Sequence, residues 1–186
     1  MHALLGSGLG MANQVSAQIL AAVYARLSDP TTGFNAGMTA QLPLYGFTDN
    51  FAVIDWSEGS SGFCFDQIDP ADLDKSGLAT YPFVCLYILD SLQAGLQKFA
   101  QFSGPIRCVL DITLSWNSMN GVYNRESYSC CVEDVVFDII NRVSNQNWGE
   151  PLVYNGVIQC RRAPTVFGAN NWRKRLTFSM TFEIHQ

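Results

Sequence analysis

Residues 106–116 read Ile-Arg-Cys-Val-Leu-Asp-Ile-Thr-Leu-Ser-Trp, and an apolar side chain occupies every even position. The odd positions are polar except for Val109. A period of two is typical of a β-strand with one buried face. The segment therefore predicts a strand over 106–116, with Asp111 on the face that points to solvent.

Three more segments predict strands on either side of this one. Residues 176–184 alternate Leu, Phe, Met, Phe and Ile with Thr, Ser, Thr and Glu, which indicates a second one-faced strand. Residues 81–89 are continuously apolar, as in a strand buried on both faces. Residues 156–162 predict a further strand, and a loop over 164–173 would separate it from the last one.

Two segments have helical periodicity. Residues 12–28 place apolar side chains at helical spacing, and residues 130–143 do the same, with Val132, Val136, Ile139 and Val143 on one face. Ser129 is the expected N-cap of the second helix. Glu133 and Asp134 near its start and Arg142 near its end suit the helix dipole. Because β-branched residues are poor helix formers, this helix should depend on packing against a sheet.

Residues 30–80 form an irregular segment rich in Gly and Pro. A structureless loop of that length is uncommon in a compact domain, so a short strand is expected at 51–56. The order of helix, insertion, two strands, helix and two strands predicts an α+β fold. Its antiparallel sheet should carry the helices on one face, within a single domain over 1–186 that includes 30–80 as an insertion-like segment.

The composition favours a protein that meets other proteins. Charged residues make up 15% of the chain, below the usual quarter or so of a soluble domain. No stretch approaches the roughly 20 apolar residues of a membrane span. The cysteines are read as reduced core thiols of a chain made in a cytoplasm, and their spacing does not match a zinc site: Cys64, Cys85, Cys108, Cys130, Cys131 and Cys160.

The two halves of the chain differ in charge. Residues 1–100 hold nine acids and three bases, a balance of −6, whereas residues 101–186 hold seven acids and eight bases, a balance of +1. An acidic surface on one copy can meet a basic surface on the next, which favours head-to-tail association. The alternative is two solvated faces with no partner.

No residue set predicts catalysis. The two histidines, His2 and His185, lie at opposite ends of the chain, and no nucleophile motif is present. Residues 72–77, Asp-Leu-Asp-Lys-Ser-Gly, match the start of a calcium loop, but Phe83 stands where the bidentate Glu belongs. An acidic surface loop is the main interpretation there, and a weak cation site is the alternative. We expect neither a catalytic site nor a cofactor.

Basic residues flank the loop between the last two strands. Arg161 and Arg162 end one strand, and Arg173, Lys174 and Arg175 begin the next, beside Trp172. A hairpin would bring these five charges to one end of the sheet. In an acidic protein such a cluster favours a protein interface, or a rim close to DNA, over sequence-specific DNA binding.

The order of elements over 12–28 and 81–186, with a final strand reading Arg-Leu-Thr-Phe-Ser-Met-Thr-Phe-Glu-Ile, resembles the tail terminator (tail completion) proteins of long-tailed bacteriophages. The resemblance implies a hexameric ring that caps the tail tube, stops its polymerisation and joins it to the head connector or stopper protein. It implies a virion location at the tail-neck junction, DNA passing nearby, no enzyme activity and no cofactor. The segment 30–80 departs from the compact family pattern.

The polar loops at 117–128 and 163–172 are the expected contact regions, because recognition residues collect on loops that project from a rigid sheet. They carry Asn117, Asn120, Asn124, Asn170, Asn171 and Trp172. Three alternatives remain. The first is another neck or head-to-tail adaptor component, and the second is a sheet-based binding domain unrelated to phages. The third is a small enzyme or cation-binding domain that uses the acidic segment 66–74.

Overall fold

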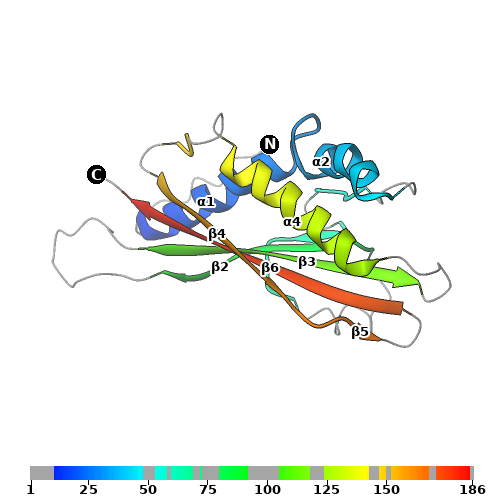
Figure 1. Cartoon of the computed structure of the whole chain (residues 1–186). Coiled ribbons are helices and arrows are strands. Elements are labelled where there is room, and N and C mark those ends of the chain that lie inside the picture. The colour runs from blue at the N-terminus through cyan, green and yellow to red at the C-terminus, as the bar shows by residue number, and fades with distance from the viewer. Residues whose placement is uncertain are drawn as a thin grey trace.

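The computed structural model describes residues 11–47, 53–57, 60–68, 72, 80–91, 105–117, 124–142, 147–149, 152–167 and 171–184. Its helices lie on one face of a six-stranded sheet (Figure 1), so the predicted α+β class is confirmed. In chain order the elements are α1 (Met11–Leu27), α2 (Phe34–Gln41), the 3₁₀ helix η1 (Leu42–Tyr45), β1 (Phe63–Cys64), β2 (Phe83–Ser91), β3 (Ile106–Asn117), α4 (Arg125–Asn141), β4 (Leu152–Arg162), β5 (Val166–Phe167) and β6 (Asn171–Ile184).

The strands lie in the order β1-β2-β3-β6-β4, and β5 pairs with β6. The pairs β2–β3, β3–β6 and β4–β6 are antiparallel, as predicted, and so is the pair of β6 with β5, a strand that was not predicted. The short strand β1 runs parallel to β2, which differs from the predicted antiparallel sheet. The sheet is therefore mixed. Strands β3 and β6 are paired along the whole of β3, from Ile106 beside Phe182 to Asn117 beside Asn171.

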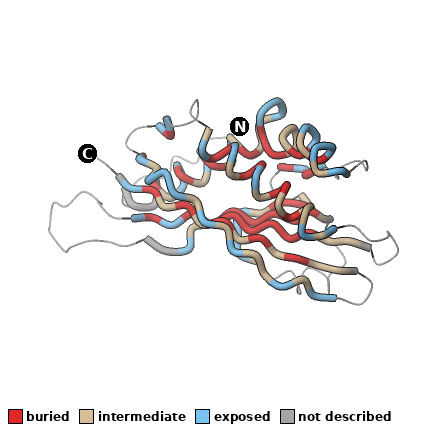
Figure 2. Tube along the Cα trace, in the orientation of Figure 1, coloured by how far each residue is buried: buried red, intermediate tan, exposed pale blue. Residues whose placement is uncertain are grey.

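The main core lies between the sheet and the helices, as the buried layer in Figure 2 shows. The alternation of β3 and β6 places their apolar side chains in this layer, which confirms both predicted strands. The prediction of a single buried face is wrong for the middle of β3, where Val109, Asp111 and Thr113 on the other face are also buried. The burial of Val132, Val136 and Ile139 confirms the core face of α4. The buried side chains of β3 and β6 in this layer are Ile106, Cys108, Leu110, Ile112, Leu114, Leu176, Phe178, Met180 and Phe182.

Part of the opposite face of the sheet is also covered. Phe83, Cys85 and Tyr87 of β2 and Val109 of β3 form a second, smaller apolar cluster on the side opposite the main core. Strand β2 is thus buried on both faces, as its continuous apolar run predicted. The prediction that Asp111 faces solvent is wrong, because its side chain lies on this covered face and only 2% of it is exposed.

Helix α4 begins earlier than predicted. Its N-cap is Asn124, whose side-chain oxygen accepts a hydrogen bond from the Ser127 backbone amide at 3.1 Å. Ser129, the predicted cap, is buried within the helix and donates to the Arg125 carbonyl at 2.7 Å. Glu126, and not Glu133 or Asp134, is therefore the acid of the first turn. The helix ends at Asn141, and Val143 lies outside the described residues.

The prediction of an irregular segment over 30–80 is wrong for residues 34–45, which form α2 and η1. Helix α2 packs closely on α4: a Cβ atom at Gly37 would lie 2.7 Å from Cγ1 of Val135, so only glycine permits this approach. Because Phe34, Met38 and Leu42 are buried, the segment supplies part of the main core.

The predicted strand at 51–56 is not formed by residues 53–56, and residues 51 and 52 lie outside the described part. The side-chain amide of Asn35 holds this stretch instead. Its nitrogen donates to the Ile54 carbonyl at 2.9 Å, and its oxygen accepts from the Ile54 amide at 3.0 Å. Ile54 and Trp56 are buried as a result.

The predicted helix 12–28 is confirmed as α1, which buries Ile19, Val23 and Leu27. Its last turn contacts the chain that precedes β4. The Arg26 guanidinium lies 3.2 Å from the centroid of the Trp148 ring and donates to the Asn147 carbonyl at 2.8 Å.

Both C-terminal strands are longer than predicted. Strand β4 includes 152–155, and the predicted loop over 164–173 contains β5 and the first residues of β6. An irregularity between Tyr154 and Ile158 interrupts the β4–β6 register, and Gly156 lies within it at φ 77°. Positive φ strains other residues, so glycine permits the bulge.

Candidate functional site

Strand pairing brings the five predicted basic residues to one end of the sheet. Arg161 and Arg162 of β4 lie opposite Thr177 and Leu176 of β6, immediately beside the run from Arg173 to Arg175. The prediction of a cluster at this end is thus confirmed, but strand alternation divides it between the two faces of the sheet. Arg162 and Lys174 face α4, whereas Arg161, Arg173 and Arg175 lie on the opposite side.

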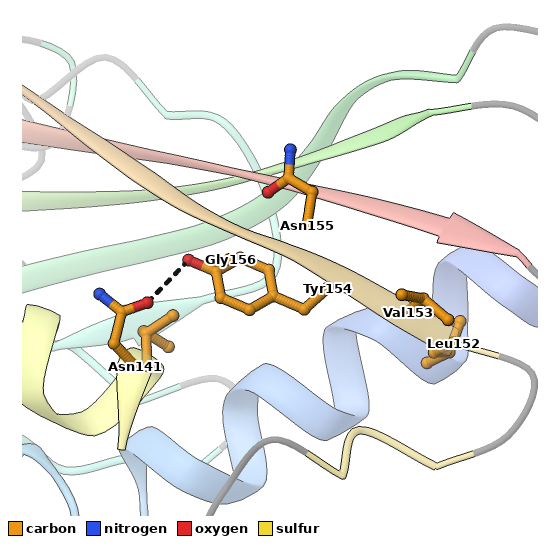
Figure 3. A pocket seen from close by; sticks show the side chains of 7 residues that line it. Asn141, Leu152, Val153, Tyr154, Asn155 and Gly156 are labelled. Carbon is orange, nitrogen blue, oxygen red and sulfur yellow. Dashed lines mark hydrogen bonds between the residues drawn. The ribbon is translucent and has the colours of Figure 1, made fainter. Parts of the chain in front are cut away.

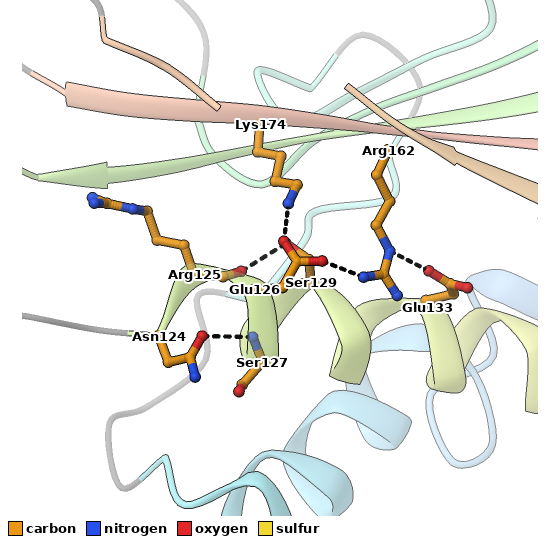
Figure 4. Close-up of polar contacts among 8 residues, drawn as sticks. All are labelled: Asn124, Arg125, Glu126, Ser127, Ser129, Glu133, Arg162 and Lys174. Carbon is orange, nitrogen blue, oxygen red and sulfur yellow. Dashed lines mark hydrogen bonds and ion pairs between the residues drawn. The ribbon is translucent and has the colours of Figure 1, made fainter. Parts of the chain in front are cut away.

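The helix-facing pair is neutralised within the chain. Figure 4 shows Lys174 and Arg162 reaching from the strands to Glu126 and Glu133 of α4. Lys174 Nζ and Arg162 Nη1 both contact the Glu126 carboxylate, and Arg162 Nε lies 2.6 Å from Oε2 of Glu133. The hydrogen bonds from Lys174 and then Arg162 hold the pKa of Glu126 below its ordinary value. These ion pairs hold α4 against the last residue of β4 and the first part of β6.

Arg175 is neutralised on the other face. Its guanidinium pairs with the buried carboxylate of Asp111, which also accepts hydrogen bonds from the Tyr87 hydroxyl at 2.8 Å and from the Thr177 hydroxyl. Burial and the bond to Asp111 raise the pKa of Tyr87, and the bond to Asp111 raises that of Arg175. Three of the five basic charges are therefore balanced inside the chain.

The other two basic residues lie at the same end of the sheet and differ in their surroundings. Arg161 is exposed, and the Arg173 guanidinium lies 5.6 Å from the centroid of the Tyr81 ring. Trp172 is half-buried on the helix side, where the Arg125 guanidinium lies 4.4 Å from its ring centroid. The cluster as a whole is thus not a free basic patch of the kind that binds phosphates.

The structure assigns a position to some of the predicted asparagines. Asn124 caps α4, which is a structural role. Asn117 and Asn171 are backbone partners at the paired ends of β3 and β6, and Asn120 and Asn170 lie outside the described residues.

The end of the sheet where β3, β5 and β6 meet is aromatic. Trp116 and Trp172 are register partners, the Phe167 ring lies 4.7 Å from that of Trp172, and the Tyr128 ring lies 5.8 Å from that of Trp116. Phe167 is nevertheless 56% exposed, and its neighbour Val166 is 59% exposed. Sequence reasoning missed this pair because a two-residue strand has no visible period, although two adjacent apolar residues within a predicted polar loop were a signal.

Exposed apolar residues continue along one edge of the sheet. Among the described elements β4 is the edge strand at the end of the sheet opposite β1 and pairs only with β6, while β5 follows it on the same side of β6. Four of the eight large hydrophobic side chains exposed in the described part of the chain lie on these two strands, namely Val153, Val157, Val166 and Phe167. We call this set the β4–β5 edge. An edge strand with exposed apolar side chains favours pairing or packing with another chain.

A cavity of about 460 Å³ lies where α4 ends beside the first part of β4. It is lined by Ile140, Asn141 and residues 152–156. Figure 3 shows Tyr154 reaching Asn141, and the Tyr154 hydroxyl donates to Asn141 Oδ1 at 3.2 Å. Burial raises the pKa of Tyr154 to about 12, so its phenol stays protonated near neutral pH. The lining offers hydrogen bonds but no acid-base pair that titrates near neutrality.

All six cysteines are free thiols. Cys85, Cys108 and Cys131 are buried, as expected of core thiols, whereas Cys64, Cys130 and Cys160 are only partly buried. In the described ranges there is no group of three or more His, Cys, Asp and Glu side chains that could hold a metal ion. The possible calcium loop at 72–77 is outside this test, since only Asp72 of it is described. No described helix combines the length and apolar character needed to cross a membrane.

The chain matches no protein-family model and no curated protein.

Proposed function

We propose that this protein is a structural component of a phage particle, a tail terminator. Copies of the chain form a ring, as in the hexamers of that family, which caps the tail tube and stops the addition of tube protein. The ring also joins the tail to the head connector or stopper protein. The proposal rests on the resemblance in element order and on an α+β fold that exposes apolar side chains along the β4–β5 edge.

The β4–β5 edge is the observation that carries the proposal. A strand edge presents unpaired backbone donors and acceptors, which another chain can extend or cover. Soluble monomers usually blunt such an edge with charged side chains or bulges. Strand β4 has a bulge at Gly156 and an exposed Arg161, yet Val153 and Val157 still project from it at exposures of 40% and 52%. Val166 and Phe167 extend the apolar surface to the end of the sheet. Contact with a neighbouring subunit would remove these four side chains from water.

Charge supports association between unlike surfaces. The first hundred residues carry −6 and the rest +1, so that head-to-tail contact brings unlike halves together. Because Arg162, Lys174 and Arg175 are paired within the chain, we assign the intersubunit role to apolar contacts at the β4–β5 edge and not to those three charges.

The mass of the purified protein tests the ring. We expect a multimer, visible as a ring by electron microscopy, and we expect Val157→Lys to shift the mass toward that of the monomer while the melting temperature stays the same. Leu44→Lys is the matched control, because Leu44 is 82% exposed and lies on η1, away from the edge. A monomeric wild-type protein, or equal effects of the two variants, would count against the proposed ring.

Particles assembled without the protein test the role in the tail. Overlong tails are expected, since nothing would stop addition of tube protein. Tails of normal length that fail to join heads would instead identify a neck or head-to-tail adaptor. Normal tails already joined to heads would exclude both functions.

A further inference from the structure

The fold brings two thiols together on the face of the sheet opposite α4. Cys64 in β1 and Cys85 in β2 are register partners in the parallel pair, although they are 21 residues apart in the chain. Their Sγ atoms lie 3.5 Å apart and share a hydrogen bond. Adjacent strands lie about 4.8 Å apart, which is within the range of roughly 4.4–6.8 Å between Cα atoms of disulfide-bonded residues.

The two thiols differ in their access to solvent. Cys64 is partly exposed, whereas Cys85 is 3% exposed and lies in the apolar cluster with Phe83, Tyr87 and Val109. The hydrogen bond with the Cys85 thiol lowers the pKa of Cys64 to about 7. The same hydrogen bond and burial raise the pKa of Cys85. Cys64 therefore provides an accessible thiolate near neutral pH, while Cys85 remains a protonated thiol beside it.

We propose that Cys64 and Cys85 form a reversible redox pair, in which Cys64 attacks a small disulfide such as oxidised glutathione and Cys85 resolves the product. An accessible attacking thiol with a second cysteine in reach is the arrangement found in redox-sensitive pairs. The pair is a modification site distinct from the β4–β5 edge, and the inference does not depend on the function proposed above.

The reaction balances in two exchanges. The Cys64 thiolate attacks one sulfur of the small disulfide, whose S–S bond breaks, and the first small thiolate leaves and takes a proton from water. Cys85 then loses its proton to solvent and attacks the Cys64 sulfur of the mixed disulfide. The second small thiolate leaves and is protonated. The protein has lost two electrons and two protons, and one small disulfide has become two thiols.

The new bond would fasten β1 to β2. Strand β1 has only two residues, and the chain before it is held through the Tyr24 hydroxyl bond to the Trp56 carbonyl at 2.7 Å and through Asn35. A covalent link at Cys64 would add to these contacts and restrict the unfolded chain. The oxidised protein should therefore be the more stable form.

The experiment treats the reduced full-length protein with oxidised glutathione, quenches it with acid and identifies blocked thiols by alkylation and peptide mass spectrometry. We expect a mass loss of about 2 Da, a linked peptide that contains Cys64 and Cys85, and recovery with dithiothreitol. Cys85→Ala should stop the reaction at a mixed disulfide on Cys64. Cys64→Ser should abolish the link, and Cys130→Ser, which removes a partly exposed thiol on α4, should leave it intact.

Thermal unfolding gives a second measurement. The oxidised wild-type protein should melt about 5 °C or more above the reduced protein, and Cys64→Ser should show no such difference. The proposal is wrong if both thiols remain open to alkylation after oxidation. It is also wrong if the oxidised product is a dimer linked between chains, or if Cys85→Ala accumulates no mixed disulfide at Cys64.

Discussion

The carboxylate of Asp111 and the guanidinium of Arg175 pair diagonally across β3 and β6, on the face of the sheet opposite α4. Asp111 is 2% exposed, and its remaining hydrogen bonds come from Tyr87 and Thr177. A carboxylate removed from water in this way is stable only while its partners are present. The pair is therefore a structural element of the outer face, and not a free charge offered to another molecule.

Asp111→Asn should destabilise the fold by about 3 kcal/mol, because it leaves the partly buried Arg175 without a counter-charge. The measurement is the free energy of unfolding in urea at pH 7. Asp138→Asn is the matched control, since the Asp138–Arg142 pair is exposed and should contribute less than about 0.5 kcal/mol. Similar losses in the two variants would contradict a stabilising role for the buried pair.

Glu126→Ala should cost about 1–2 kcal/mol, because Lys174 is 7% exposed and would lose its partner. The pKa of Glu126 is lowered in the folded protein, so its stabilisation is complete above the ordinary value of 4.5 and is lost as the pH falls through the lowered value. The difference in unfolding free energy between wild type and variant should therefore shrink in acid. Adding Lys174→Met should recover part of the loss at pH 7, and strict additivity of the two changes would argue against coupling.

Ile139→Asp should unfold the domain or cost several kcal/mol, because Ile139 is 1% exposed in the core face of α4 and the new charge would have no partner. Circular dichroism during heating measures the effect. Ala21→Asp places the same charge at an exposed position of α1 and should change the melting temperature little. A normal melting temperature for Ile139→Asp would contradict the packing of α4 on the sheet.

Alkylation of Cys64 should be half-maximal near pH 7, because the bond with the Cys85 thiol lowers its pKa. Removing that hydrogen-bond partner with Cys85→Ala should move the midpoint toward the ordinary value of 9.0. Cys160 provides the internal comparison, since burial above all raises its pKa to about 12 and it should react slowly at neutral pH. Rates measured by mass spectrometry between pH 6 and about 9.5 test both expectations. A midpoint unchanged in Cys85→Ala would exclude the thiol contact as the cause.

Periodicity predicted the elements whose burial repeats along the chain. The strand segments 106–116 and 176–184 alternate with a period of two, and α4 repeats at helical spacing, because each places its apolar side chains in the same core layer. Helix α2 was not predicted, since its stability depends on contacts distant in sequence. Gly37 lets it approach Val135, and Asn35 bonds to Ile54.

Alternation along one strand says which side chains share a face, but not whether that face is covered. Asp111 is buried because Tyr87 and Arg175, respectively 24 and 64 residues away, lie over it. In the same way, Cys64 and Cys85 meet only because the short strand β1 pairs in register with β2. The alternation of apolar and polar residues along the sequence cannot predict these contacts, since they depend on which strands become neighbours.

The basic residues show most clearly the difference between what the sequence determined and what the tertiary structure decided. The sequence by itself determined that Arg161 and Arg162 would meet the run from Arg173 to Arg175 at one end of the sheet, because they flank one connection between antiparallel strands. Only the tertiary structure decided where their charges go. The pairing register turns Arg162 and Lys174 toward the acids of α4 and Arg175 toward Asp111, since successive side chains of a strand point to opposite faces and each face has its own neighbours.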